Sequence, residues 1–124
     1  REERARSVLS SVGLAGRVSD PSESLSQLEL RKLELARALV GNPKVLIADE
    51  AMAGLSEEEI DEVLAILLAL NRSGVAVIMI EHIMHAVMRF SERIVCFETG
   101  RLIASGTSTE IAENPLVQKV YFGE

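Results

Sequence analysis

The chain has 124 residues, 48% of them hydrophobic and 26% charged, which is the balance of a globular domain with a core of its own. Its net charge of -6 argues against nucleic acid as a partner, because a duplex-binding surface needs a basic patch. The charge does not argue against a nucleotide as a ligand, because a nucleotide needs only a local phosphate site. The single cysteine excludes an internal disulfide, and no apolar run approaches the roughly 20 residues of a membrane-spanning helix.

The first part of the chain is predicted to consist of helices joined by a polar loop. Apolar residues recur at helical spacing in residues 1–12, whereas residues 17–24 are polar and turn-prone. Ser26 then opens a second helix, because Ser26 and Glu29 have the spacing of a capping box. Gly41 is typical of the turn that follows a helix end, so this helix is expected to end there.

The next stretch has four consecutive apolar residues, 45–48, which run directly into Asp49 and Glu50. Such a run predicts a strand that is buried on both faces, as in a parallel sheet. Ligands of open α/β sheets bind at the carboxyl ends of strands, and adjacent acids on an extended chain point to opposite sides. One carboxylate could therefore face a metal ion while the other faces a water molecule. The alternative interpretation is a strand that turns polar where it meets solvent.

A second buried strand is predicted after an intervening helix. Ser56 and Glu59 form another capping box, and residues 75–80 are a second apolar, β-branched run. The order strand, helix, strand predicts a parallel βαβ unit. Glu81 and His82 follow the second strand as the two acids follow the first, so neighbouring strands could bring His82 to the same crevice.

The remaining residues are predicted to form short elements. Residues 83–90 read as a helix, and residues 93–98 and 101–106 read as an antiparallel hairpin around a glycine turn. Thr107 begins a third capping box. A break at residues 114–115 precedes a last amphipathic turn or two.

In this order, the features resemble the second half of an ATP-binding-cassette (ABC) ATPase. The resemblance rests on the serine-led helix, on L-E-L-A-R-A-L-V-G-N-P-K-V-L-I-A-D-E and on a second apolar strand that ends in E-H. The closing G-x-x-I-A-x-G-T-x-x-E-I and the tail N-P-L-V-Q-K-V-Y-F-G-E look like the ATPase subunits of branched-chain amino acid importers. The resemblance implies an α/β, incomplete P-loop NTPase-type fold of three layers, with mostly parallel buried strands and a C-terminal β-hairpin. Residues 1–40 would belong to the helical subdomain and residues 41–124 to the ATPase core.

The resemblance also implies roles for single residues. Asp49 matches the Walker B aspartate, which holds Mg²⁺, usually through water, and Glu50 matches the general base that orients the attacking water. His82 matches the switch histidine, which contacts the γ-phosphate, and Ser26 matches the signature serine, which reaches the γ-phosphate across a dimer. The implied cofactors are ATP and Mg²⁺. The implied partners are a second ATPase subunit and membrane permease subunits, at the inner face of the cell membrane.

Some residues depart from the family pattern. Gln27, Leu28 and Glu29 stand where the family has Gly, Gly and Gln. Leu28 places a side chain where backbone should approach phosphate, and Glu29 adds a negative charge there. Residues 54–56 match the loop that touches the partner subunit, although Ser56 replaces its usual aspartate.

The 124 residues contain no G-x-x-x-x-G-K-[ST] phosphate loop, so the chain by itself is expected to bind ATP poorly and to be inactive. Because it begins with an arginine and already in a helical pattern, we expect it to be a piece of a longer protein. Bare strand edges in such a piece would favour a strand-exchanged homodimer. The alternative function is a non-catalytic dimerisation or regulatory module derived from an ABC ATPase, which Leu28 and Glu29 favour.

Overall fold

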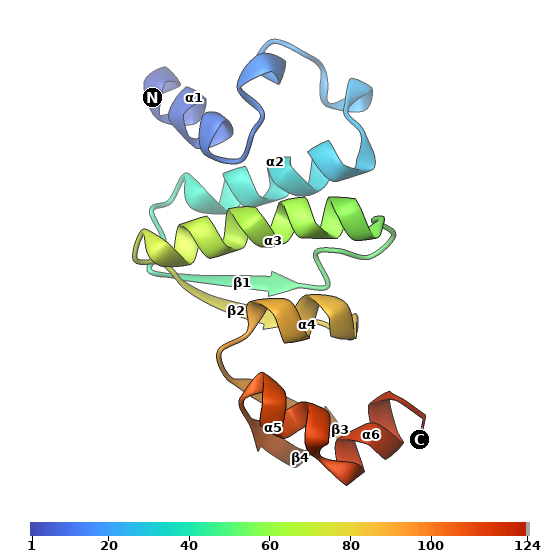
Figure 1. Ribbon diagram of the computed structural model, residues 1–124. Helices are drawn as coiled ribbons and strands as arrows, with labels where there is room; N and C mark the ends of the chain where they lie inside the picture. Colours follow the sequence, from blue (N-terminus) through green and yellow to red (C-terminus); the bar gives the residue numbers. More distant parts are fainter. Residues whose placement is uncertain (124) are drawn as a thin grey trace. The chain divides into compact units, whose positions relative to one another are not determined.

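The structure is a computed structural model that describes residues 1–123. It divides into two compact units, Arg1–Glu81 and His82–Glu124 (Figure 1). The first unit contains, in order, α1 (Glu2–Ser11), the 3₁₀ turns η1 (Ala15–Arg17) and η2 (Ser22–Ser24), α2 (Gln27–Leu39), β1 (Val45–Asp49), α3 (Glu57–Arg72) and β2 (Ala76–Ile80). The predicted functional division after residue 40 is a different boundary, and it stays a prediction.

The first unit is built on the parallel pair β1 and β2. Their register runs from Val45 opposite Ala76 to Asp49 opposite Ile80, and α3 connects the two strands, which confirms the predicted βαβ unit. α3 lies beside β2 (Figure 1). It buries an aliphatic stripe at helical spacing, made of Ile60, Val63, Leu64 and Leu67. The core of this unit is therefore aliphatic, as the scarcity of aromatic residues indicates.

The two strands are buried on one face only. Leu46 is 5% exposed, whereas its neighbour Ile47 is 61% exposed, because successive side chains of a strand point to opposite faces. The register places the exposed residues of both strands on the same side. We call this set the exposed sheet face; it consists of Val45, Ile47, Ile78 and Ile80, which are 49–61% exposed. The prediction of burial on both faces is wrong here, because helices of this unit cover a single face of its two-stranded sheet.

All three predicted capping boxes are present. Ser26, Ser56 and Thr107 each accept a hydrogen bond from the backbone N–H three residues later. The glutamate at that later position accepts one from the backbone N–H of the capping residue in return. These reciprocal bonds satisfy N–H groups that have no partner within the helix, so they fix where α2, α3 and α5 begin.

The second unit contains α4 (Met84–Phe90), β3 (Ile94–Glu98), β4 (Arg101–Gly106), α5 (Ser108–Glu113) and α6 (Pro115–Tyr121). β3 and β4 pair antiparallel, as predicted, around Thr99 and Gly100, whose φ angles are 48° and 76°. Two positive φ angles suit the tight turn that matches the twist of a hairpin. The core of this unit comprises Val87, Ile94, Cys96, Ile111 and Val117. Burial raises the pKa of the Cys96 thiol.

Within the portion of the chain that the structure describes, no helix has both the length and the apolar character needed to cross a bilayer.

The one-sided burial of β1 gives the first prediction. We expect Leu46→Ala to lower the free energy of unfolding by about 2–5 kcal/mol, the usual loss for a buried leucine. Ile47→Ala should lower it by less than about 1 kcal/mol, since its side chain is already mostly in solvent. Urea unfolding of the two variants measures the difference. Equal losses would contradict the exposure of Ile47 in solution.

Candidate functional site

The candidate site begins with the two acids at the carboxyl end of β1. Asp49 is the last residue of the strand and lies opposite Ile80 in the register. The Glu50 N–H donates to the Ile80 carbonyl at 2.9 Å, so the ladder continues one step beyond the strand. Both acidic residues are exposed. Asp49 and Glu50 therefore lie at the carboxyl end of the strand, as predicted.

The backbone of Glu50 differs from the expectation of an extended chain. Its φ angle is 48°, in the left-handed region, where residues other than glycine are uncommon. Glu50 therefore does not follow the strand rule by which adjacent acids point to opposite sides. The turn at this residue directs its carboxylate instead. Backbone strain of this kind concentrates at functional sites, so the observed outlier favours a functional role for Glu50.

The segment after Glu50 is held against the first unit. Met52 is fully buried, and the N–H of Leu55 donates to the carbonyl of Met52 at 3.2 Å. Between them, the carbonyl of Ala53 accepts a hydrogen bond from the Arg31 guanidinium, at 3.1 Å from Nη2, on α2. The turn that carries Glu50 is therefore tied both to the core and to the helix that begins after Ser26.

Ser26 is the N-cap of α2, and this role is compatible with a contact to phosphate. Its hydroxyl oxygen accepts from the Glu29 N–H at 3.1 Å, and the Glu29 carboxylate accepts from the Ser26 N–H at 3.0 Å. A serine hydroxyl has one donor and two acceptor positions, and capping uses only an acceptor. The hydroxyl proton can thus still be donated to an anion placed at the helix start.

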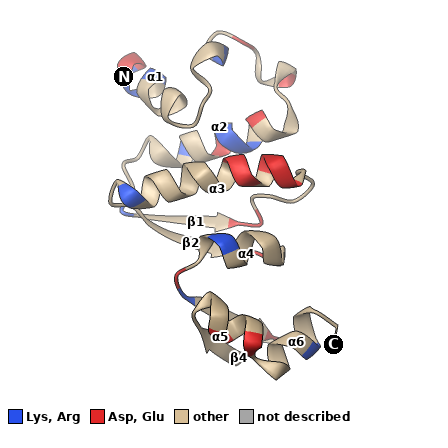
Figure 2. Cartoon of the chain, in the orientation of Figure 1, with Lys and Arg blue, Asp and Glu red and all other residues tan. Residues whose placement is uncertain are grey.

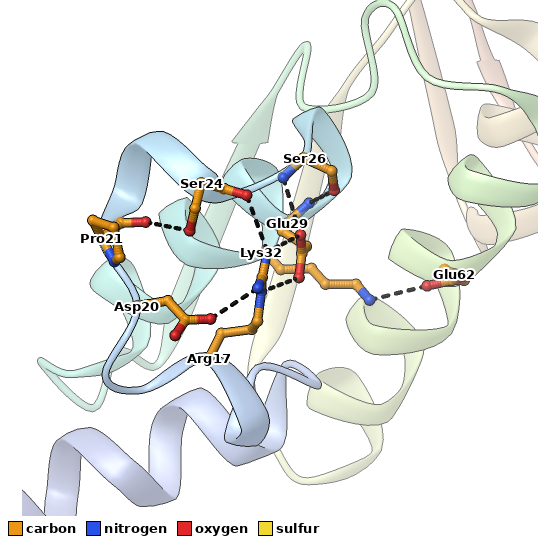
Figure 3. A network of polar contacts seen from close by, with 8 residues as sticks. All are labelled: Arg17, Asp20, Pro21, Ser24, Ser26, Glu29, Lys32 and Glu62. Carbon is orange, nitrogen blue, oxygen red and sulfur yellow. Dashed lines mark hydrogen bonds and ion pairs between the residues drawn. The ribbon is translucent and has the colours of Figure 1, made fainter.

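A bidentate ion pair compensates the charge of Glu29. Arg17 donates to its carboxylate through Nε at 2.9 Å and through Nη2 at 3.1 Å (Figure 3). The N–H of Ser26 and then Arg17 lower the pKa of Glu29 below its ordinary value. The hydrogen bond to Glu29 in turn raises the pKa of Arg17. The negative charge of Glu29 therefore lies next to the positive charge of Arg17.

Arg17 also fastens the polar loop that precedes α2. It forms an ion pair with Asp20 at 2.8 Å and donates to the carbonyl of Ser24 at 3.0 Å (Figure 3). Arg17 is not among the residues predicted from the sequence, because no fixed spacing links a loop arginine to a helix residue twelve positions later. A lone arginine in an otherwise uncharged or acidic loop is the only signal that could have pointed to it.

Several other charged residues of the first unit have structural roles. The first turns of α3 carry the run of acids Glu57, Glu58 and Glu59, visible in Figure 2, where the helix dipole favours negative charge. Lys32 of α2 forms an ion pair with Glu62 of α3 at 2.9 Å (Figure 3). The pair of Lys32 and Glu62 links α2 to α3 and does not involve Asp49 or Glu50.

His82 is the first residue of the second unit, and its side chain is exposed. In the sequence it lies two positions after Ile80. The Ile80 carbonyl accepts the hydrogen bond from the Glu50 N–H. The structure brings together Asp49 and Glu50, and it ties their turn to the helix of Ser26. The proximity of His82 to the acids stays a prediction.

The candidate residues do not form a complete metal site by themselves. In the described part of the chain no group of three or more His, Cys, Asp or Glu residues is arranged to hold a metal ion. Mg²⁺, however, is commonly bound by one or two carboxylates together with substrate phosphates and water. An exposed aspartate such as Asp49 therefore fits an ion that arrives with a nucleotide.

The backbone of Glu50 gives a prediction about stability. Asparagine tolerates the left-handed region and valine does not. We expect Glu50→Asn to be more stable than Glu50→Val by about 1–2 kcal/mol in urea unfolding. The same pair at Asp49, which is in the strand, should give the opposite order, because strands favour valine over asparagine. The same order at both positions would contradict the left-handed turn.

The Arg17–Glu29 pair gives a prediction about pH. The pKa of Glu29 is lower in the folded than in the unfolded chain, so the pair stabilises the fold at neutral pH. This contribution should be complete above the ordinary glutamate pKa and should be lost as the pH falls through the folded value. We therefore expect the stability difference between the native chain and Arg17→Met to shrink in acid, measured by thermal unfolding across the pH range. A difference independent of pH would contradict the pairing.

Two known protein families match the two ends of the chain. The family described as ABC transporter matches residues 1–53, and the family described as branched-chain amino acid ATP-binding cassette transporter matches residues 101–124. The methionine import ATP-binding protein MetN of Staphylococcus haemolyticus is 36% identical over 91% of this chain and 33% of its own length. The lipopolysaccharide export system ATP-binding protein LptB of Escherichia coli K12 is 35% identical over 100% of this chain and 52% of its own. The chain thus spans between one third and about half the length of these relatives.

Solved structures confirm the predicted α/β fold of an ABC ATPase. The ADP conformation of MJ1267, an ATP-binding cassette of an ABC transporter, superposes with a TM-score of 0.90 and 26% identity, over 98% of this chain and 50% of that one. The protein cbiO1 of Clostridium perfringens superposes with a TM-score of 0.85 and 28% identity, over 98% and 49%. In sequence and in fold, the chain is therefore similar to the ATP-binding domains of ABC transporters.

Proposed function

We propose that the chain is the C-terminal part of the ATP-binding and hydrolysing subunit of an ABC importer for branched-chain amino acids or similar solutes. The observation that carries the proposal is the pair Asp49 and Glu50 at the carboxyl end of β1, with Glu50 held in a left-handed turn. The match of residues 101–124 to the branched-chain amino acid family supports the solute class. MetN is named for methionine import and LptB for lipopolysaccharide export, so these relatives support only the ATPase role.

In this proposal each site residue has a distinct task. Asp49 would hold the Mg²⁺ that arrives with the nucleotide, and this ion would supply positive charge at the phosphates. Glu50 accepts a hydrogen bond from the attacking water and takes up its proton as the oxygen attacks the γ-phosphorus, while the bond from that phosphorus to the bridging oxygen breaks and ADP leaves. His82 donates a hydrogen bond to a γ-phosphate oxygen. Ser26 donates its hydroxyl proton to the γ-phosphate bound by the partner subunit, while it continues to cap α2.

The proposed complex requires residues that this chain does not contain. The 124 residues have no G-x-x-x-x-G-K-[ST] segment, so we propose that the rest of a longer subunit supplies the phosphate loop. Two such subunits would enclose ATP between them and would act with membrane permease subunits at the cytoplasmic face of the membrane. The similar protein cbiO1 is part of the ABC transporter complex cbiONQ, which supports partners of this kind.

The test is steady-state ATP hydrolysis by the complete subunit. Glu50→Gln keeps the size of the side chain and removes its basicity, so kcat should fall by about 10²–10⁴-fold, the range for loss of a general base. Binding of a fluorescent ATP analogue with Mg²⁺ should persist. Glu57→Gln is the matched control, because Glu57 is an exposed acid in the first turn of α3. Full activity in Glu50→Gln would refute the catalytic role.

A second candidate function is a non-catalytic dimerisation module. The exposed sheet face favours it, because contiguous apolar surface of this kind often marks an interaction site. Packing of two exposed sheet faces would cover this surface, whereas a strand-exchanged homodimer would pair the bare strand edges. This candidate predicts no ATP turnover when a complete nucleotide-binding half is supplied, whereas the ATPase proposal predicts turnover that depends on Glu50.

A further inference from the structure

We propose that Arg31 is a positioning residue for the hydrolytic step. Its guanidinium holds the carbonyl of Ala53 and so fixes the turn that carries Glu50 relative to the helix that Ser26 begins. The inference rests on the proposed function, since it concerns the placement of the same general base. Arg31 itself is not proposed to touch ATP or the attacking water.

The contact joins two segments that lie 22 positions apart in the sequence. Arg31 Nη2 lies 3.1 Å from the Ala53 carbonyl oxygen, and the Arg31 side chain is 27% exposed. A hydrogen bond from a charged donor in a partly buried place is among the stronger ones. Gln27 Nε2 also approaches this oxygen, but at 3.5 Å, the outer limit for such a bond. Arg31 is therefore the principal donor.

The contacts that restrain the turn between Glu50 and Leu55 act at separate points along it. At its start the Glu50 N–H is bonded to Ile80, and in its middle Met52 is buried in the core. Ala53 follows Met52 directly, and its carbonyl is where the turn meets α2. Glu50 also sits in a strained left-handed conformation, which persists only where surrounding contacts hold it. Release of the Ala53 carbonyl would let the turn relax toward a less strained shape.

Gln27 and Gly54 fit each other at the same contact. Gln27 stands where the family signature has glycine, and a Cβ added to Gly54 would lie 2.7 Å from Gln27 Nε2. Gly54 also has a φ angle of 80°, which a glycine adopts without strain. The side chain of Gln27 therefore occupies the space that a side chain at position 54 would need, and the glycine at position 54 leaves that space open.

A change in the position of the general base affects the chemical step more than nucleotide binding. A displacement of about 1 Å from a productive geometry can lower a rate by about 10²-fold. Most of the binding energy for ATP comes from contacts to its phosphates elsewhere, so KM should change little. Loss of the Arg31 contact should therefore appear in kcat, which a purely structural role would not predict.

The experiment compares three variants of the complete ATP-binding subunit in steady-state ATP hydrolysis. Arg31→Met should lower kcat about tenfold or more, with KM for ATP within about twofold. Arg31→Lys retains one charged donor and should recover part of kcat. Lys32→Met is the matched control: it removes the adjacent positive charge and the ion pair to Glu62, but no contact to the turn, so kcat should be unchanged. Thermal unfolding checks that all three variants remain folded.

Glu50→Gln, measured alongside, separates the two proposals. If Glu50→Gln abolishes hydrolysis while Arg31→Met leaves kcat unchanged, or lowers it no more than Lys32→Met, the positioning role is refuted and the proposed function stands. If Glu50→Gln retains full activity, the proposed function itself fails. Equal loss of kcat in Arg31→Met and Arg31→Lys, with altered KM, would also overturn the inference, because it would indicate a direct contact to the nucleotide.

Discussion

The hydrogen bond from the Glu50 N–H to the Ile80 carbonyl is the constraint on which the candidate site depends. The parallel ladder between β1 and β2 ends at Asp49 and Ile80, and this bond carries it one residue further. It holds Glu50 at the sheet while the chain turns away with a φ angle of 48°. Without it, the acid would belong to a solvent loop, and the sheet could not set the direction of its carboxylate.

The start of α2 shows how a departure from the family signature can be accommodated. Glu29 brings a negative charge toward the place where the resemblance puts a phosphate, but the same carboxylate completes the capping box and accepts two bonds from Arg17. The local field at the Ser26 hydroxyl is therefore that of a neutralised pair at a helix N-terminus, not that of a free carboxylate. Leu28 is half-buried, so it is part of the packing of α2 as well as of the altered signature.

Local rules predicted most of the fold but little of the tertiary contact pattern. The three capping boxes, the parallel strand pair and the hairpin at Thr99 and Gly100 follow from residue type and spacing, so they could be predicted. The burial of Ile47 was predicted wrongly, because an apolar run indicates which residues can be buried and not what covers them. The left-handed turn at Glu50 and the contact of Arg31 with Ala53 carry no sequence signal, since each depends on segments that meet only in the folded chain.

The exposed sheet face favours the dimerisation module but is also compatible with an ATPase subunit, so it does not decide between the two candidate functions. The position of Glu50 bears more directly on the choice. A left-handed glutamate costs about 1–2 kcal/mol relative to a residue suited to that conformation. Thr99 has the same φ angle of 48° in the hairpin turn, so the left-handed backbone alone does not mark a catalytic residue. Glu50 differs from Thr99 because its turn follows Asp49 at the carboxyl end of the parallel strands, where an acid can serve the proposed hydrolysis.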